Sequence, residues 1–279
     1  MRCVILPEKI EFTSENIDFY LKELSKIFRK LNGKTMPAEI TLIGGASILI
    51  NYGFRNFTYD MDAVIHASSA MKEAINQVSD KFQIPTDWLN TDFKSTKSYS
   101  PKLDTVSKHY KTFSNVLEIR TISAEYLIAM KLMSGRKYKH DLSDVIGIIN
   151  EHNNLQNPIS LSQIKNAFIT LYDDINKMPL YSSKMLTSIF DTENLSELFE
   201  KVQNQESLFA KELTEFNRMY PETLNDDNTN EILDVLKTMK EKTATKHLSI
   251  SRKQIKDNSE NLVKAHDKHF KKDKTISIE

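Results

Sequence analysis

The hydrophobic pattern of the N-terminal part of the chain changes between helical and strand-like spacing. Apolar residues recur at helical spacing over 14–31 and from about 69 to 82, which predicts two amphipathic helices. Residues 83–112 show no clear period and are expected to be irregular. Strand-like runs occur at 39–43, 60–66 and 116–121, with a short apolar helix expected over 48–52 between the first two.

After residue 123 the spacing becomes helical and stays so. Helices are expected at 124–134, 141–152, 161–175, 182–190, 195–218 and 229–242. Strands followed by a run of helices are typical of an α+β protein. We therefore expect a mixed-sheet head over 1–122, a helical domain over 123–242 and a basic tail over 243–279. Sparse apolar residues in the tail predict a loosely held helix or partial disorder.

Composition narrows the class of protein only a little. The 279 residues include 38 basic and 38 acidic side chains, so bulk charge predicts neither nucleic-acid nor membrane binding. One cysteine, Cys3, excludes an internal disulfide framework and a cysteine-rich zinc site. The apolar start is too short for a signal peptide, and no apolar run approaches the ~20 residues of a membrane span. We therefore expect a cytoplasmic protein without a membrane partner.

Candidate chemistry is concentrated around the first two predicted strands. Gly44, Gly45 and Ser47 follow the first strand, and Asp60 and Asp62 open the second. Alternate side chains of a strand share a face, so the two carboxylates are expected side by side. Mg²⁺ prefers such oxygens and shares them with phosphates, while glycines and a helix N-terminus admit an anion. The alternatives are a solvent-facing strand edge and an ordinary strand-to-helix turn.

The Gly-Gly/Ser turn followed by Asp-x-Asp resembles the nucleotidyltransferase superfamily of the polymerase β type. Glu118 then lies in the third strand-like run, and Lys131 interrupts an apolar helix. Arg136 and the stretch His140-Asp141-Leu142-Ser143-Asp144 follow. This order resembles the bacterial nucleotidyltransferases related to the abortive-infection toxin AbiEii. The resemblance covers roughly residues 36–155 and implies a polymerase β-like fold.

The resemblance also implies roles for individual residues. Two Mg²⁺ ions would be held by Asp60, Asp62 and Glu118, with Asp104 as the alternative third carboxylate. The nucleoside triphosphate would be bound by Gly44, Gly45, Ser47, Arg55, Thr58 and Arg136. Lys131 and Asp141 would belong to the catalytic site, with Asp144 as a further candidate.

Several of these residues also have an ordinary structural interpretation. Arg55 could simply solvate its loop, and Lys131 could extend from its apolar helix into water. Asp141 could be a helix N-cap with Asp144 in the first turn. Glu118 could pair with a surface lysine. The sequence leaves these alternatives open.

The function implied by the resemblance is Mg²⁺-dependent transfer of a nucleoside monophosphate from a nucleoside triphosphate to an RNA end, with tRNA as the expected acceptor. The protein would act as a toxin of a toxin–antitoxin or phage-defence system, with an antitoxin protein as partner. An antibiotic or protein nucleotidyltransferase is the first alternative. A catalytically silent nucleotide- or RNA-binding module is the second, against which the intact pair Asp60 and Asp62 argues.

Overall fold

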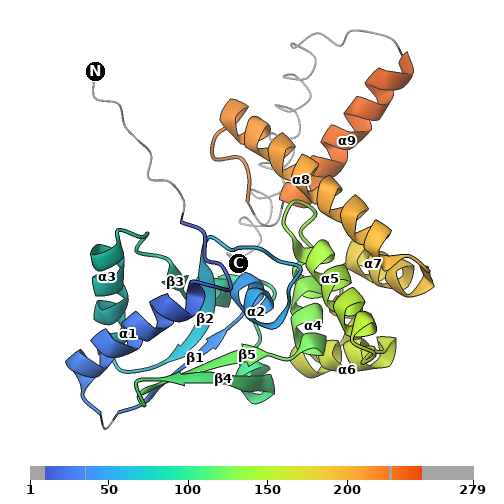
Figure 1. Cartoon of the computed structure of the whole chain (residues 1–279). Helices are drawn as coiled ribbons and strands as arrows, with labels where there is room; N and C mark the ends of the chain where they lie inside the picture. Colours follow the sequence, from blue (N-terminus) through green and yellow to red (C-terminus); the bar gives the residue numbers. More distant parts are fainter. Residues whose placement is uncertain (1–9, 35, 226–227, 247–279) are drawn as a thin grey trace, which may run out of the picture. The chain divides into compact units, whose positions relative to one another are not determined.

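The computed structural model describes residues 10–34, 36–225 and 228–246. The helices are α1 (Ile17–Asn32), α2 (Gly44–Asn51), α3 (Ala70–Phe82), α4 (Ala124–Ser134), α5 (Asp141–Asn154), α6 (Leu161–Tyr172), α7 (Leu180–Asp191), α8 (Leu195–Met219) and α9 (Thr229–Lys246), shown in Figure 1. The strands are β1 (Ala38–Leu42), β2 (Met61–His66), β3 (Leu89–Asn90), β4 (Ser107–Phe113) and β5 (Leu117–Ile122). Cys3 and the expected tail beyond residue 246 lie outside the described residues.

The strands of the described part form one mixed sheet in the order β3-β2-β1-β5-β4. The central strand β1 is antiparallel to β2 and parallel to β5. At the edges, β3 is parallel to β2 and β4 is antiparallel to β5. A mixed sheet followed by helices confirms the expected α+β fold, which is compatible with a nucleotidyltransferase head and a helical region.

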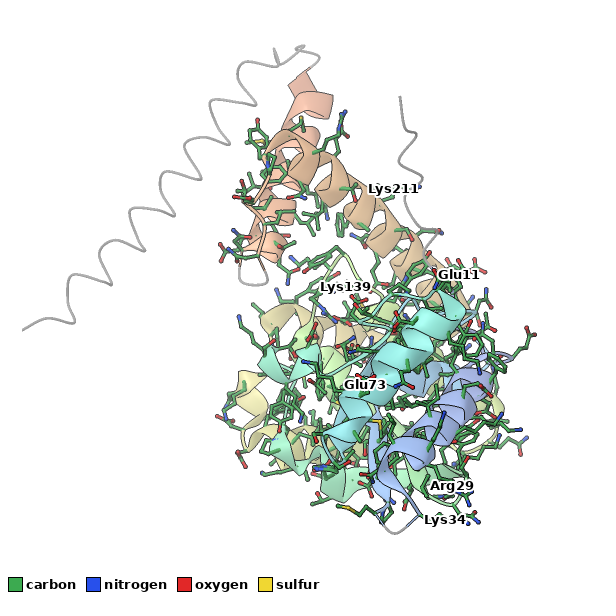
Figure 2. All side chains as sticks on the ribbon, turned by 90° about the vertical axis from the view of Figure 1, so that its left-hand side faces the viewer. Glu11, Arg29, Lys34, Glu73, Lys139 and Lys211 are labelled. Carbon is green, nitrogen blue, oxygen red and sulfur yellow. The ribbon has the colours of Figure 1, made fainter. Side chains whose placement is uncertain are left out.

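One face of the sheet is buried under α1 and α3. Figure 2 shows these two helices side by side, with Arg29 near the C-terminal end of α1 and Glu73 on α3. Their apolar stripes pack on alternate residues of the central strands, as the helical spacing predicted. The core on this face includes Leu21, Leu24, Ile40, Leu42, Val78, Leu117 and Ile119.

A second core joins the other face of the sheet to the helices that follow it. Ile43, Val64 and Ile122 belong to this core together with residues of α4, α5 and α6. The short helix α2 contributes to both cores, with Ile48 in this one and Leu49 in the first. Because both sides of α2 are packed, the glycine turn at its N-terminus is held in a fixed position.

The expectation of an irregular segment over 83–112 is wrong in part, because β4 occupies Ser107–Phe113. This strand pairs only with β5, and Lys108, His109 and Lys111 are exposed. An edge strand buries little, so it lacks the apolar alternation by which strands are recognised, and lysines are common on such edges. The strand β3 has only two residues, too few to show an alternating pattern.

The described chain forms two compact units. The first contains the sheet and α1–α7, and comprises the chain as far as Arg136 together with His140–Asn204. The second contains Lys137–Lys139 and the chain from Gln205, with a small core around Phe209, Leu213 and Leu233. Within the first unit, α4 packs against α2, and the expected head over 1–122 and helical domain over 123–242 remain predictions. Every helix in the described part is too short or too polar to traverse a membrane.

Candidate active site

The turn from β1 into α2 lies directly against Asp62. The amide of Ile43 donates a hydrogen bond to the backbone oxygen of Asp62 at 3.0 Å, which joins the end of β1 to the start of β2. Gly44 has a φ of 55°, in the left-handed region. A β-carbon at Gly44 would lie 3.6 Å from Oδ2 of Asp62. The carboxylate therefore stands over the turn, where the first amides of α2 have no intrahelical acceptor.

The second glycine of the turn is covered by the loop that joins α2 to β2. A β-carbon at Gly45 would lie 2.8 Å from Oγ1 of Thr58 and 3.0 Å from Nη2 of Arg55. The Thr58 hydroxyl donates to the backbone oxygen of Asp60 at 3.1 Å. Gly45 thus has no room for a side chain, because the residues that precede Asp60 pack on its α-carbon.

Asp60 and Asp62 are the carboxylates that the sequence suggests as metal ligands. Asp60 immediately precedes β2 and is exposed, and its side chain has no hydrogen bond or ion pair with any residue that the structure describes. Asp62 is half-buried. Within the described ranges, no cluster of three or more metal-binding side chains is present. Two carboxylates fit Mg²⁺, which commonly completes its coordination with water and substrate phosphates.

Ser47 has a structural contact in the interior. Its side chain is fully buried, and Oγ accepts a hydrogen bond from the amide of Ile122 at 3.2 Å. This bond ties α2 to the end of β5.

Glu118 and Asp104 do not lie beside the aspartate pair. Asp62 is level with Ile43, the residue that follows β1, whereas Glu118 pairs with Glu39, four residues earlier in the chain. Four residues of strand correspond to about 13 Å. Glu118 instead accepts from Arg120 Nη1 at 2.6 Å. Asp104 accepts from Nε2 of His66 at 2.8 Å, at the far end of β2 from Asp62.

The remaining charged candidates form one continuous network. Lys131 Nζ lies 2.7 Å from Asp144 and 3.2 Å from Asp141. Arg55 Nη1 donates to both oxygens of Asp144 at 2.8 and 3.1 Å. Arg136 donates to both oxygens of Asp141 from Nε and Nη2, at 2.8 and 3.1 Å. The network joins the α2–β2 loop to α4 and α5.

This network decides between the interpretations that the sequence left open. Lys131 is 9% exposed and Asp141 fully buried, so the lysine does not extend into water. His140, not Asp141, is the N-cap of α5. Burial alone would raise the pKa of Asp141, but the charges and hydrogen bonds of Lys131 and Arg136 hold that pKa well below its usual range. Arg55 is fixed by Asp144 and does not simply solvate its loop.

Arg55 retains one unpaired donor group. Nε donates to the backbone oxygen of Phe57, and Nη1 binds Asp144. Nη2 donates to no residue within the described part of the chain, and it lies against Gly45. The arrangement therefore presents a fixed guanidinium edge at the glycine turn, where it can bind an anionic oxygen.

A family model described as a nucleotidyltransferase of unknown function (DUF6036) matches residues 19–184. The matched stretch runs from α1 into α7 and contains all the candidate residues described above. Comparison with curated proteins and with solved structures gives no match.

Proposed function

The chain belongs to the DUF6036 nucleotidyltransferases, and we propose that it uses Mg²⁺ to transfer a nucleoside monophosphate from a nucleoside triphosphate to an RNA end. The acceptor oxygen attacks the α-phosphorus, and the bond from that phosphorus to the bridging oxygen of the β-phosphate breaks. Pyrophosphate leaves, and the acceptor proton passes to solvent.

The position of the Asp62 carboxylate over the Gly44 turn is the observation that carries this proposal. It combines a carboxylate, a turn without side chains and the N-terminus of a helix in one place. A carboxylate alone would repel a triphosphate. A cation held by Asp60 and Asp62 would reverse that repulsion and bring phosphate oxygens towards the amides of α2. The combination therefore favours a metal-bound nucleotide over a free anion.

The chain's own groups would act mainly by positioning. Asp60 and Asp62 hold Mg²⁺, which supplies positive charge to the attacking and leaving oxygens when bound. Arg55 Nη2 donates to a phosphate oxygen beside Gly45. Thr58 keeps the preceding loop in place through its bond to the Asp60 backbone. Glu118 has no part in our proposed metal site, because the sheet register separates it from Asp62.

Lys131, Arg136 and Asp141 complete the proposed active site. Their ion pairs join them to Asp144 and through it to Arg55, so the network holds the Arg55 guanidinium at the glycine turn.

The acceptor and the biological role rest on the resemblance to AbiEii-related proteins. That resemblance favours a tRNA end as acceptor, in the cytoplasm, and a toxin whose growth arrest is relieved by an antitoxin protein. Expression of the full chain should slow bacterial growth, and Asp62→Ala should relieve that effect. Equal toxicity of both forms would contradict an enzymatic toxin.

The direct test is incubation of the full chain with Mg²⁺, each α-labelled nucleoside triphosphate in turn, and total bacterial RNA. Label should enter a tRNA-sized band, and Asp60→Ala/Asp62→Ala should abolish it. Asp80→Asn is the matched control, since Asp80 is an exposed aspartate on α3. Label on protein would show that the acceptor is a protein and not RNA. Nucleotide binding without transfer to any acceptor would favour a silent binding module.

A further inference from the structure

The loop that leads to Asp60 lies along one face of α5 before it reaches the glycine turn. Its residues meet the helix in reverse order, so the loop and the helix run antiparallel. The contacted stretch of α5 runs over nine residues, from Asp144 to His152, about 12 Å of helix. In order, the pairs are Arg55 with Asp144, Phe54 with Gly147, Gly53 with Glu151 and Tyr52 with His152.

The Phe54 ring lies against Gly147 and fills the space of a side chain there. A β-carbon at Gly147 would lie 2.6 Å from Cε2 of Phe54 and 2.8 Å from both Cδ2 and Cζ. The ring also packs edge-on against Phe199 at 5.8 Å between centroids. The ring is therefore enclosed on several sides. Any side chain at Gly147 would displace it, together with the backbone of the loop.

Two hydrogen bonds fix the beginning of the same segment. The amide of Gly53 donates to Oε2 of Glu151 at 3.1 Å. Nδ1 of His152 lies 3.0 Å from the backbone oxygen of Asn157, which can only accept, so that nitrogen carries the proton. Nε2 of neutral His152 then accepts from the Tyr52 hydroxyl at 3.3 Å.

The far end of the loop is held by a different part of the chain. Thr58 exchanges two backbone hydrogen bonds with Phe12, at 2.7 and 2.9 Å, and Phe12 is fully buried. Asp60 follows two residues later. The path from α5 to Asp60 is thus fixed at both ends, and the part held by α5 includes Arg55.

We propose that Gly147 and Glu151 are positioning residues for the nucleotidyl transfer proposed above, on which this inference rests. Gly147 admits the Phe54 ring and Glu151 holds the Gly53 amide, so that α5 sets where Arg55, Thr58 and Asp60 stand relative to the glycine turn. Neither residue touches substrate. Glycine in a helix interior costs about 1 kcal/mol relative to alanine, so α5 itself gains nothing from Gly147. The close contact with Phe54 accounts for its presence.

The test compares Gly147→Ala with Gly53→Ala in the full chain. Gly53 is in the same loop, but a β-carbon there meets nothing within 4 Å, which makes it a matched control. Gly147→Ala should speed amide hydrogen exchange over 52–60 and lower kcat by about ten- to a hundredfold, as expected for ångström-scale misplacement. KM for the triphosphate should change less than kcat. Gly53→Ala should leave exchange and kinetics as in the wild type.

A second pair of variants separates positioning from general destabilisation. Once Phe54→Ala has removed the ring, adding Gly147→Ala should have little further effect on exchange over 52–60 or on kcat, because the two residues act through one contact. Glu151→Gln should keep most activity, since its amide oxygen still accepts from Gly53, whereas Glu151→Ala should speed exchange over 52–60.

The hydrogen-exchange readout keeps this inference distinct from the proposed activity. If the wild type transfers no label, the proposed function fails, and exchange over 52–60 still reports whether α5 holds the loop. Unchanged exchange in Gly147→Ala would overturn the inference whatever the activity. Faster exchange with an unchanged kcat would also overturn it, because the loop would then be held without consequence for transfer.

Discussion

Arg55 and Asp144, which are 89 positions apart in the sequence, form an ion pair with Nη1 2.8 Å from Oδ2. The same carboxylate lies 2.7 Å from Nζ of Lys131. One buried aspartate therefore connects the α2–β2 loop to α4 and α5. This connection means that the charges of the network contribute to the fold as well as to any chemistry.

Replacing Lys131 by methionine should destabilise the protein substantially. Lys131→Met leaves Asp141 and Asp144 buried with fewer compensating charges, and breaking a buried pair typically costs about 3–5 kcal/mol. Urea unfolding at pH 7 would measure the loss. Lys102→Met is the matched control, because Lys102 forms an ion pair with the exposed Asp173, and solvent-exposed pairs contribute little to stability. Equal, small losses in both variants would contradict a structural role for the buried network.

Stability should fall at acid pH through Asp141. The native pKa of Asp141 is lowered by Lys131 and Arg136 against the opposing effect of burial, whereas the unfolded carboxyl has a pKa of about 3.9. The ionised Asp141 therefore contributes to the free energy of unfolding above about pH 4. This contribution is lost as the pH falls below that value towards the native pKa. Thermal melts from pH 6 to 3 should show this loss. Asp141→Asn should flatten the profile, and Asp173→Asn, at an exposed carboxylate, should leave it steep.

Two glycines with positive φ should respond differently to alanine. Gly44 and Gly33 have φ values of 55° and 79°, so each substitution should cost roughly 1–2 kcal/mol of stability. Only at Gly44 would the new β-carbon meet the Asp62 carboxylate, while nothing lies within 4 Å at Gly33. Gly44→Ala should lower label transfer about tenfold or more, and Gly33→Ala should not. Equal activity of the two variants would show that the Gly44 turn has no role in the proposed reaction.

Glu118→Gln should retain transfer activity within a few fold. The sheet register places Glu118 opposite Glu39, about 13 Å along the strand from the level of Asp62. Asp62→Asn should lower the rate by at least about a hundredfold, because several kcal/mol of charge stabilisation depend on the metal position. Parallel rate measurements at saturating Mg²⁺ would compare the two. If Glu118→Gln lowered the transfer rate as much as Asp62→Asn, Glu118 would have to be a metal ligand after all.

Much of the secondary structure is predictable because it depends on local spacing. The periods of α1 and α3 and the apolar runs of β1, β2 and β5 are determined by neighbouring residues. The edge strand β4 was not predicted, since most of its side chains are exposed and, among the described strands, it pairs with β5 alone. Gly147 carried a detectable signal, because a glycine inside a helical pattern often marks a close contact. The pattern did not identify Phe54 as that contact.

The sequence by itself determined the mixed fold, the glycine turn, the Asp-x-Asp pair and the order of the charged residues that follow. Each depends on residues a few positions apart. Only the tertiary structure decided that Glu118 stands apart from Asp62, that Lys131 is buried between two carboxylates, and that Arg55 is held by Asp144. Strand register and the packing of α5 bring together or separate residues that are distant in the sequence, and local spacing contains no information about those distances.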